Sequence, residues 1–284
     1  MKQNEDNTNQ IDVDKAWNTL YTRLEAERLL PVKAEEQSVP ERKIQLGWIA
    51  AAAAVFTGII FSVLYFSQGR DQSLLVLQNN ENAGTLVATL EDGSTVYLAS
   101  HASITYPVAF AANQRKVELN GDALFSVTKN EKRPFVVETN KGITVEVVGT
   151  VFAVQSSPGN LFELSVKQGK VNVHSKDNQT KVFVEAGEIV RLNINGLSKS
   201  KITNPQAFGR FAEKMSFKDE KLDNIVHAIN TLYSSPAIIA DKSLNNRTLT
   251  VTFENDSVEA MTELICLALN LERVSKQDTI FIRK

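Results

Sequence analysis

The feature that most constrains this chain is an uninterrupted apolar segment near its amino end. Residues 46–66 read LGWIAAAAAVFTGIIFSVLYF, and no charged residue occurs between Lys43 and Arg70. As an α-helix this segment is about 30 Å long, which matches the hydrocarbon thickness of a bilayer. A spanning segment has to be helical, because lipid offers the backbone no hydrogen-bond partners. The sequence therefore predicts a transmembrane helix over residues 44–66.

Two alternatives fit this segment less well. A buried helix of a soluble core seldom runs this long without a charge, and a cleaved signal peptide does not carry about forty residues ahead of its apolar part. Basic residues predict the orientation, since they are enriched on the cytoplasmic side. Four precede the segment within about twenty residues, and these are Arg28, Lys33, Arg42 and Lys43. Only Arg70 follows it closely, so we expect a cytoplasmic amino terminus and an exported carboxyl terminus.

The residues before the apolar segment predict one amphipathic helix, capped by Asp12 or Asp14. Its apolar residues recur at spacings of four, three and four and share one face: Val13, Trp17, Leu20 and Leu24. Residues 1–10 offer nothing to bury and are expected to be disordered, and residues 31–40 carry a proline at each end and predict a linker. A helix of this length is marginal alone in water. Its apolar face therefore needs a partner, either within a small cytoplasmic helical bundle or on another protein.

Strand signals repeat in close succession from about residue 85 to residue 197. Short runs alternate apolar and polar residues, as at Val171 and Val173 or Val182 and Val184. Nine of the thirteen glycines lie between Gly84 and Gly196, several in dipeptides typical of turns: Asp92-Gly93, Asn120-Gly121, Lys141-Gly142, Gln168-Gly169 and Asn195-Gly196. The pattern predicts an all-β domain over residues 83–200, a sandwich, a barrel or a solenoid, which residues 67–82 link to the membrane.

The period changes from about residue 210 and predicts a mixed segment over 210–284. The expected order is β-α-β-β-α-β-β: strand 211–217, a helix from about 222 to 232, strands 237–240 and 247–253, a helix from about 256, and strands 271–275 and 279–283. Asp219 is a candidate cap for the first helix. Asp256, with Glu259 three residues later, has the capping-box pattern for the second. This order predicts a small α+β domain, so the whole chain is expected to be multi-domain and mainly β.

Several of these segments resemble the FecR-like anti-sigma regulators of bacterial cell-surface signalling. The most specific is 90–107, LEDGSTVYLASHASITYP, followed in the family's order by RKVELNGDALFSV (115–127), RPFVV (133–137), VVGTVFAV (147–154) and Ala186-Gly187-Glu188. The residues that match the family signature are Asp92, Gly93, Ser94, Tyr106, Pro107, Gly121, Pro134, Phe135, Gly149, Thr150, Phe152, Gly187 and Glu188. The carboxyl-terminal segment is similar to the small domain that ends many such regulators, and to the short module of secretins and TonB-dependent transducers. The sequence departs from the family pattern at Asp122, Leu124, Ser126, Ala153 and Ala186.

The resemblance implies a transmembrane anti-sigma factor of the cell inner membrane. Its cytoplasmic tail, residues 1–43, would hold an extracytoplasmic-function sigma factor through Val13, Trp17, Leu20 and Leu24. Its periplasmic part would receive a signal from the N-terminal signalling domain of a TonB-dependent outer-membrane transporter. Membrane lipid is the third expected partner, whereas no cofactor and no direct contact with nucleic acid are expected.

Composition and motifs weigh against other classes of protein. With 31 basic and 33 acidic residues the chain has no net field to recruit nucleic acid, and a single cysteine, Cys266, excludes an internal disulfide. His101, His174 and His227 lie far apart without metal-ligand spacing, and no nucleophile elbow or phosphate loop occurs. An enzyme is therefore not expected. The alternative is a membrane-anchored extracytoplasmic module that binds a ligand or a wall polymer and has no role in transcription.

Overall fold

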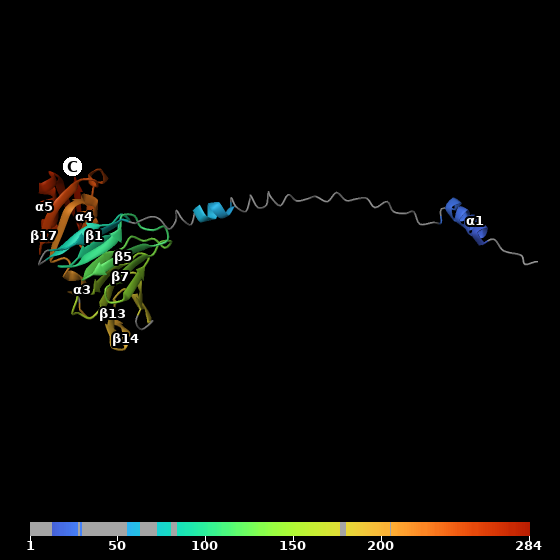
Figure 1. Ribbon diagram of the computed structural model, residues 1–284. Coiled ribbons are helices and arrows are strands. Elements are labelled where there is room, and N and C mark those ends of the chain that lie inside the picture. The colour runs from blue at the N-terminus through green and yellow to red at the C-terminus, as the bar shows by residue number, and fades with distance from the viewer. Residues whose placement is uncertain are drawn as a thin grey trace, which may run out of the picture. The chain divides into compact units, whose positions relative to one another are not determined.

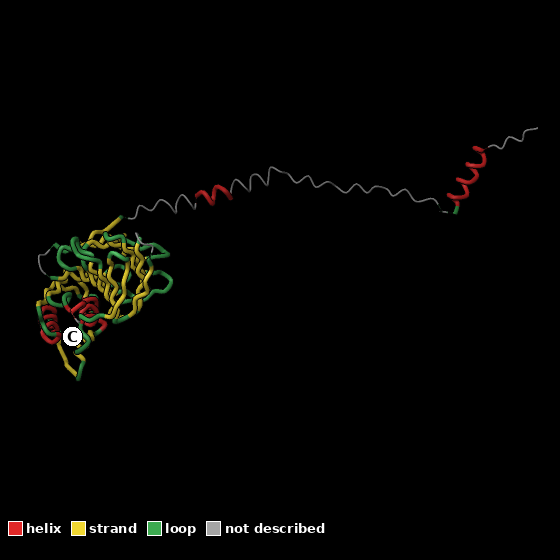
Figure 2. The backbone as a smooth tube through the Cα atoms, turned by 90° about the horizontal axis from the view of Figure 1, so that it is seen from below, coloured by secondary structure: helices red, strands yellow, loops and turns green. Residues whose placement is uncertain are grey.

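The computed structural model describes residues 13–27, 29, 56–62, 73–80, 84–176, 180–204 and 206–284. The chain divides into two compact units, Met1–Gly69 and Arg70–Lys284, drawn in Figures 1 and 2. The first contains α1 (Val13–Ala26). Of the predicted transmembrane helix, only residues 56–62 belong to the described part, and they are helical. Among the described residues, no helix combines the length and apolarity needed to cross a membrane. The predicted disordered end (1–10) and linker (31–40) lie outside the described residues.

The second unit is built on two sheets that form a β-sandwich, which is one of the three predicted all-β forms. The seven-stranded sheet has the order β1 (Leu74–Gln78), β4 (Ser103–Pro107), β5 (Arg115–Asn120), β7 (Phe135–Thr139), β8 (Ile143–Val147), β11 (Lys170–Ser175), β12 (Lys181–Glu185). The nine-stranded sheet has the order β14 (Gly196–Lys201), β13 (Glu188–Asn193), β10 (Glu163–Gln168), β9 (Val151–Gln155), β6 (Ala123–Ser126), β3 (Thr95–Leu98), β2 (Thr85–Thr89), β15 (Lys214–Lys221), β17 (Thr248–Glu254). The mainly β prediction is thereby confirmed. Strand β1 falls within the stretch predicted as a linker and pairs antiparallel with β4.

The core between the two sheets follows from alternation along their strands. In β8, Ile143, Val145 and Val147 are buried and the residues between them are not, as expected for a strand with one face inside. Rings from the two sheets meet in this core. Phe125 stacks on Phe152 with centroids 5.2 Å apart, and Phe135 of the other sheet lies 6.1 Å from Phe125. Such aromatic contacts add to the burial of apolar area that holds the sandwich together.

The carboxyl-terminal segment has the predicted order of elements. After α3 (Gln206–Gly209) come β15, α4 (Leu222–Leu232), β16 (Ala237–Ala240), the short η1 (Lys242–Leu244), β17, α5 (Val258–Leu269), β18 (Glu272–Lys276) and β19 (Thr279–Arg283). Strands β16, β19 and β18 form a separate three-stranded sheet. Strand β15 instead pairs in parallel with β2, with Met215 opposite Thr85 and Phe217 opposite Val87. The segment therefore extends a sheet of the sandwich, and in Figure 1 its orange-to-red ribbon lies against those strands.

The centre of the nine-stranded sheet is consequently buried on both faces. Val96 and Leu98 point into the core of the sandwich. Tyr97 and Leu124 join a second core, which includes Ile225 and Met261 of helices α4 and α5. All four residues of β3 and all four of β6 are buried. The architecture is therefore a two-sheet sandwich whose nine-stranded sheet packs a second core, with α4, α5 and the three-stranded sheet, on its other face.

Both predicted helix caps are wrong. Helix α4 begins after Lys221, which makes no side-chain cap bond, and Asp219 lies inside β15 at φ 49°. Strand β15 runs on to Lys221 because a register shift lets it continue pairing with β17. The cap of α5 is Ser257, whose hydroxyl accepts from the N–H of Ala260 at 3.2 Å. Asp256 instead accepts from the N–H of Glu254. The cap of α5 therefore lies one residue later than the sequence predicts.

Candidate functional site

The apolar face of α1 is exposed. Trp17 is 58% exposed and Leu20 46%, and no residue of this helix is buried. The four predicted contact residues, Val13, Trp17, Leu20 and Leu24, all belong to the helix. Asp14 lies in its first turn and not at the cap, and Asp12 is outside the described residues. The helix therefore presents an uncovered apolar stripe of the kind that packs into a groove.

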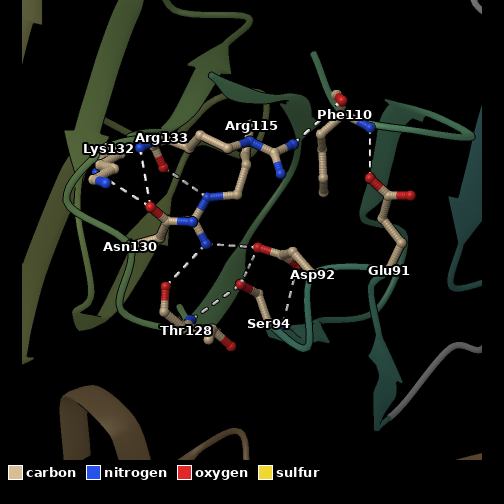
Figure 3. A network of polar contacts seen from close by, with 9 residues as sticks. All are labelled: Glu91, Asp92, Ser94, Phe110, Arg115, Thr128, Asn130, Lys132 and Arg133. Carbon is tan, nitrogen blue, oxygen red and sulfur yellow. Dashed lines mark hydrogen bonds and ion pairs between the residues drawn. The ribbon is translucent and has the colours of Figure 1, made fainter. Parts of the chain in front are cut away.

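The signature turn of residues 92–94 is one side of a buried polar network (Figure 3). Asp92 accepts from the backbone N–H of Ser94 at 3.0 Å and from its hydroxyl at 2.7 Å. The N–H of Thr128 donates to the same hydroxyl at 3.1 Å. Gly93, between the two side chains, has φ 79°, a conformation that glycine adopts without strain. These contacts fix the turn between β2 and β3.

Arg115 occupies the centre of this network. Its Nη1 lies 2.7 Å from Asp92 Oδ2, and the two side chains are only 1% and 9% exposed. Its guanidinium also donates to the carbonyls of Thr128 and Arg133, at 2.9 Å each, and lies 5.5 Å from the ring centroid of Phe135. Such a charge-assisted network can tie strands together. Its arrangement points to a structural role.

Arg115 was not among the predicted site residues, although the sequence carries a signal for it. Along β5 the burial alternates, and Arg115 shares the inward face with Val117 and Leu119. A charge at an inward position indicates a buried ion pair, because an unpaired buried charge is costly. Its partner could not be chosen from the sequence, because Asp92 is 23 residues away.

The other signature residues lie at turns and packing positions. Pro134 accepts from the N–H of Arg115, and Thr150 Oγ1 donates to the carbonyl of Lys170 at 3.0 Å. Tyr106 and Pro107 lie in β4 beside β1, and burial raises the pKa of the Tyr106 phenol. A Cβ at Gly149 would lie 2.7 Å from the Cα of Lys129.

Gly187 and Glu188 lie outside the Arg115 network, at the turn into β13. Glu188 accepts from the N–H of Glu185 at 2.8 Å and pairs with Lys199 at 3.0 Å. Both contacts, the backbone one first, lower the pKa of this carboxyl. The signature as a whole therefore specifies the sandwich and does not form one site.

Polar contacts lock the carboxyl-terminal segment to the sandwich. Tyr97 donates to the carbonyl of Ala228 at 2.9 Å. Lys167 donates to the carbonyls of Thr231 and Leu232, at 2.7 and 3.1 Å, at the end of α4 where cations are favoured. These side chains come from β3 and β10 and reach the same helix.

Asp122, a position where the chain departs from the family pattern, makes the third connection. One of its oxygens accepts from the backbone N–H groups of Ser156 and Ser157 and from the hydroxyl of Ser157. The other pairs with Arg210 at 3.1 Å. The aspartate therefore joins β6, the loop after β9 and the start of the carboxyl-terminal segment.

A cleft of about 590 Å³ lies beside this junction. It is lined by Ser126, Val127, Thr128, Lys129, Gly149, Thr150, Val151, Lys167, Gln168, His227, Asn230, Thr231 and Ser234. Lys129, Lys167 and His227 are among these residues, and none of the lining residues is acidic. The sequence could not predict this cleft, because it joins β10 to α4, some sixty residues apart.

The remaining sequence candidates for reactive chemistry are the three histidines and Cys266. Among the described residues, no three His, Cys, Asp or Glu side chains cluster as metal ligands. Cys266 lies in α5 and is buried, and burial raises the pKa of its thiol. A thiol held protonated is a poor nucleophile, so Cys266 serves as a packing residue.

Comparison with known proteins gives matches for both parts of the second unit. Residues 80–172 match the family described as FecR protein, and residues 214–282 match the family described as FecR, C-terminal. Two crystal structures of a candidate anti-sigma factor from Parabacteroides distasonis ATCC 8503 are each 24% identical to the chain. They cover 74% and 75% of this chain and 99% of their own, with TM-scores of 0.46 and 0.44. No curated protein matches the chain.

The two family matches occur in the order expected from the resemblance, and together they cover most of the sandwich and of the carboxyl-terminal segment. This chain belongs to the FecR family.

Proposed function

We propose that this protein is a transmembrane anti-sigma factor. Its cytoplasmic tail, residues 1–43, sequesters an extracytoplasmic-function sigma factor. Its periplasmic part receives a signal from the N-terminal signalling domain of a TonB-dependent outer-membrane transporter. The anchor between the two is the apolar segment 44–66, with the cytoplasmic side set by the basic residues that precede it. Family membership supports the regulatory role.

The observation that carries the proposal is the exposed apolar stripe of α1. More than half of the Trp17 side chain is exposed, in a helix that has no buried residue. Leaving such a stripe in water is unfavourable, and a tryptophan is a frequent anchor of helix-in-groove complexes. A sigma factor that covers the stripe would be kept from RNA polymerase.

The tail experiment tests the proposal directly. Residues 1–43 are co-expressed with the extracytoplasmic-function sigma factors of the source organism, and co-purification is measured. We expect one sigma factor to be retained and Trp17→Ala to weaken binding by about 2 kcal/mol or more, the range of interface anchors. Lys15→Gln, on the same helix, is the matched control and should retain binding. If no sigma factor is retained by the wild-type tail, the extracytoplasmic binding module becomes the better interpretation.

On the far side of the membrane, strand β17 is a candidate docking edge for the transporter. It ends the nine-stranded sheet, so one of its edges lacks a neighbour among the described strands. Leu264 and Leu267 of α5 are 43% and 73% exposed. An extended segment that paired with β17 would complete its hydrogen bonds, as in strand addition.

The edge can be tested without disturbing the core. Thr250 lies in the middle of β17 and is exposed. Thr250→Pro removes a backbone donor from the edge and should abolish cross-linking to the transporter's signalling domain. Thr250→Val keeps the backbone donor and should preserve cross-linking. Equal cross-linking by both variants would rule out this edge.

A further inference from the structure

The cleft beside the junction has an unbalanced charge. Lys129, Lys167 and His227 line it, and no aspartate or glutamate does. Lys129 pairs with Glu131 at 2.9 Å, but both side chains are more than two-thirds exposed, and exposed pairs of this kind are weak. The lining therefore carries more basic side chains than carboxylates.

Lys167 supplies the strongest indication of a ligand. Its side chain is half-buried, and within the described residues no carboxylate lies within 4.0 Å of its ammonium group. Two of its three N–H groups donate to the carbonyls of Thr231 and Leu232. Burial lowers the pKa of this lysine, as expected for a cation without a counter-charge. Lys167 lines the cleft, and one of its three donors is not used by these two bonds.

The rest of the lining is uncharged and mixes hydroxyl and amide side chains with Val127 and Val151. Gln168 and Ser234 are exposed side chains of the lining, and Thr128 and Ser126 add hydroxyl groups. Amides and hydroxyls arranged around a cationic floor suit a molecule that carries several hydroxyl groups beside one negative charge. A volume of about 590 Å³ accommodates one or two sugar rings.

We propose that this cleft binds an acidic sugar, with Lys167, Lys129 and His227 around its carboxylate and the amides and hydroxyls on its ring. The bound sugar would touch both the sandwich and α4. Ligand binding therefore stabilises the docking of the carboxyl-terminal segment, because whatever binds only the docked state favours that state. This site is separate from α1, so it goes beyond sigma-factor binding and does not depend on it.

The experiment is calorimetric titration of the purified full-length chain with D-glucuronate, D-glucose and inorganic phosphate. We expect D-glucuronate to bind and D-glucose, which has the same ring without the charge, to bind at least about tenfold more weakly. Lys129→Gln and His227→Gln should each weaken D-glucuronate binding several-fold. Lys170→Gln is the matched control, since Lys170 is an equally exposed lysine outside the cleft that also pairs with a glutamate; its affinity should equal that of the wild type.

The proposal is overturned by no heat with D-glucuronate, by equal affinities for D-glucuronate and D-glucose, or by unchanged binding in both cleft variants. Preferential binding of phosphate would also reject a sugar as the ligand. Circular dichroism of each variant checks that it is folded. Because the titration contains no sigma factor, its outcome is distinguishable from that of the tail experiment.

Discussion

Arg115 carries its charge inside the sandwich, and Asp92 is the carboxylate that balances it. Asp92→Asn would leave the guanidinium buried without its counter-charge, so we expect the free energy of unfolding to fall by about 3–5 kcal/mol. Urea unfolding followed by circular dichroism measures the loss. Glu185→Gln removes the exposed pair with Lys170 and should leave the unfolding midpoint unchanged. Similar midpoints for the two variants would contradict a stabilising role for the buried pair.

Tyr97 makes the stability of the second unit sensitive to alkaline pH. Burial raises the pKa of its phenol well above the ordinary value of 10.0. Above pH 10.0 the unfolded chain therefore loses this proton while the folded chain keeps it. The contribution of the Tyr97 phenol to the free energy of unfolding is fully present below pH 10.0. It declines as the pH rises toward the pKa of the folded state. Tyr97→Phe should make the decline shallower, as measured by urea unfolding between neutral and strongly alkaline pH.

The control for this pH dependence is Tyr106→Phe. Tyr106 is only half-buried, and burial raises the pKa of its phenol as well. Its substitution should change the alkaline decline less than that of Tyr97 does. A Tyr97→Phe profile parallel to the wild type would show that the buried phenol does not govern the alkaline transition.

At the scale of single elements, the turn between β5 and β6 depends on Gly121. Its φ is 98°, and a Cβ at this position would lie 2.8 Å from the Cβ of Ala102. Gly121→Ala should therefore lower the free energy of unfolding by about 2–4 kcal/mol, through backbone strain plus overlap. Gly187 has φ 82° but open space around it. Gly187→Ala is the control and should cost only the strain, about 1 kcal/mol. Thermal or urea unfolding compares the two, and equal losses would refute the overlap.

The strands of the second unit could be predicted because most have one face inside. Alternation at Val171 and Val173 gives this signal directly. In β3 the alternation predicts that Val96 and Leu98 face inward. It does not predict the burial of Tyr97 on the opposite face. A run without polar residues, such as VYL or ALF, is typical of a strand that is covered on both sides. The sequence held this signal, although it could not identify the covering helices.

Only some of the residues described in the candidate site could be predicted from the sequence. The resemblance located Asp92, Gly93 and Ser94, and the structure gives them one network. Arg115, their partner, could be suspected only from its inward position. The cleft around Lys167 could not be predicted, because its lining comes from strands and a helix that only the tertiary fold brings together. Long-range pairing of this kind leaves no local pattern in a sequence.

At the scale of the whole second unit, the sandwich and the carboxyl-terminal segment share a sheet and a core. The parallel pairing of β2 with β15 provides the sheet. The second core provides the apolar contact, since Val87, Tyr97 and Leu124 pack with residues of α4 and α5. An isolated sandwich would expose this apolar face to water. The domain boundary predicted near residue 200 marks a change of sequence pattern. Residues on the two sides of this boundary pack together in the second core.

This shared core predicts that the second unit unfolds as one cooperative body. We expect a single urea transition by circular dichroism, with the same midpoint for the near-ultraviolet and far-ultraviolet signals. A chain truncated after residue 204 loses the cover over Val87, Tyr97 and Leu124. It should unfold at a lower urea concentration and bind a hydrophobic dye such as ANS, since the exposed patch is apolar. Two separate transitions in the full-length chain, together with an unchanged midpoint in the truncated one, would show that each part is stable alone. In that case the junction contacts of Tyr97 and Lys167 would dock two finished domains, and substitutions there would alter docking without altering either midpoint.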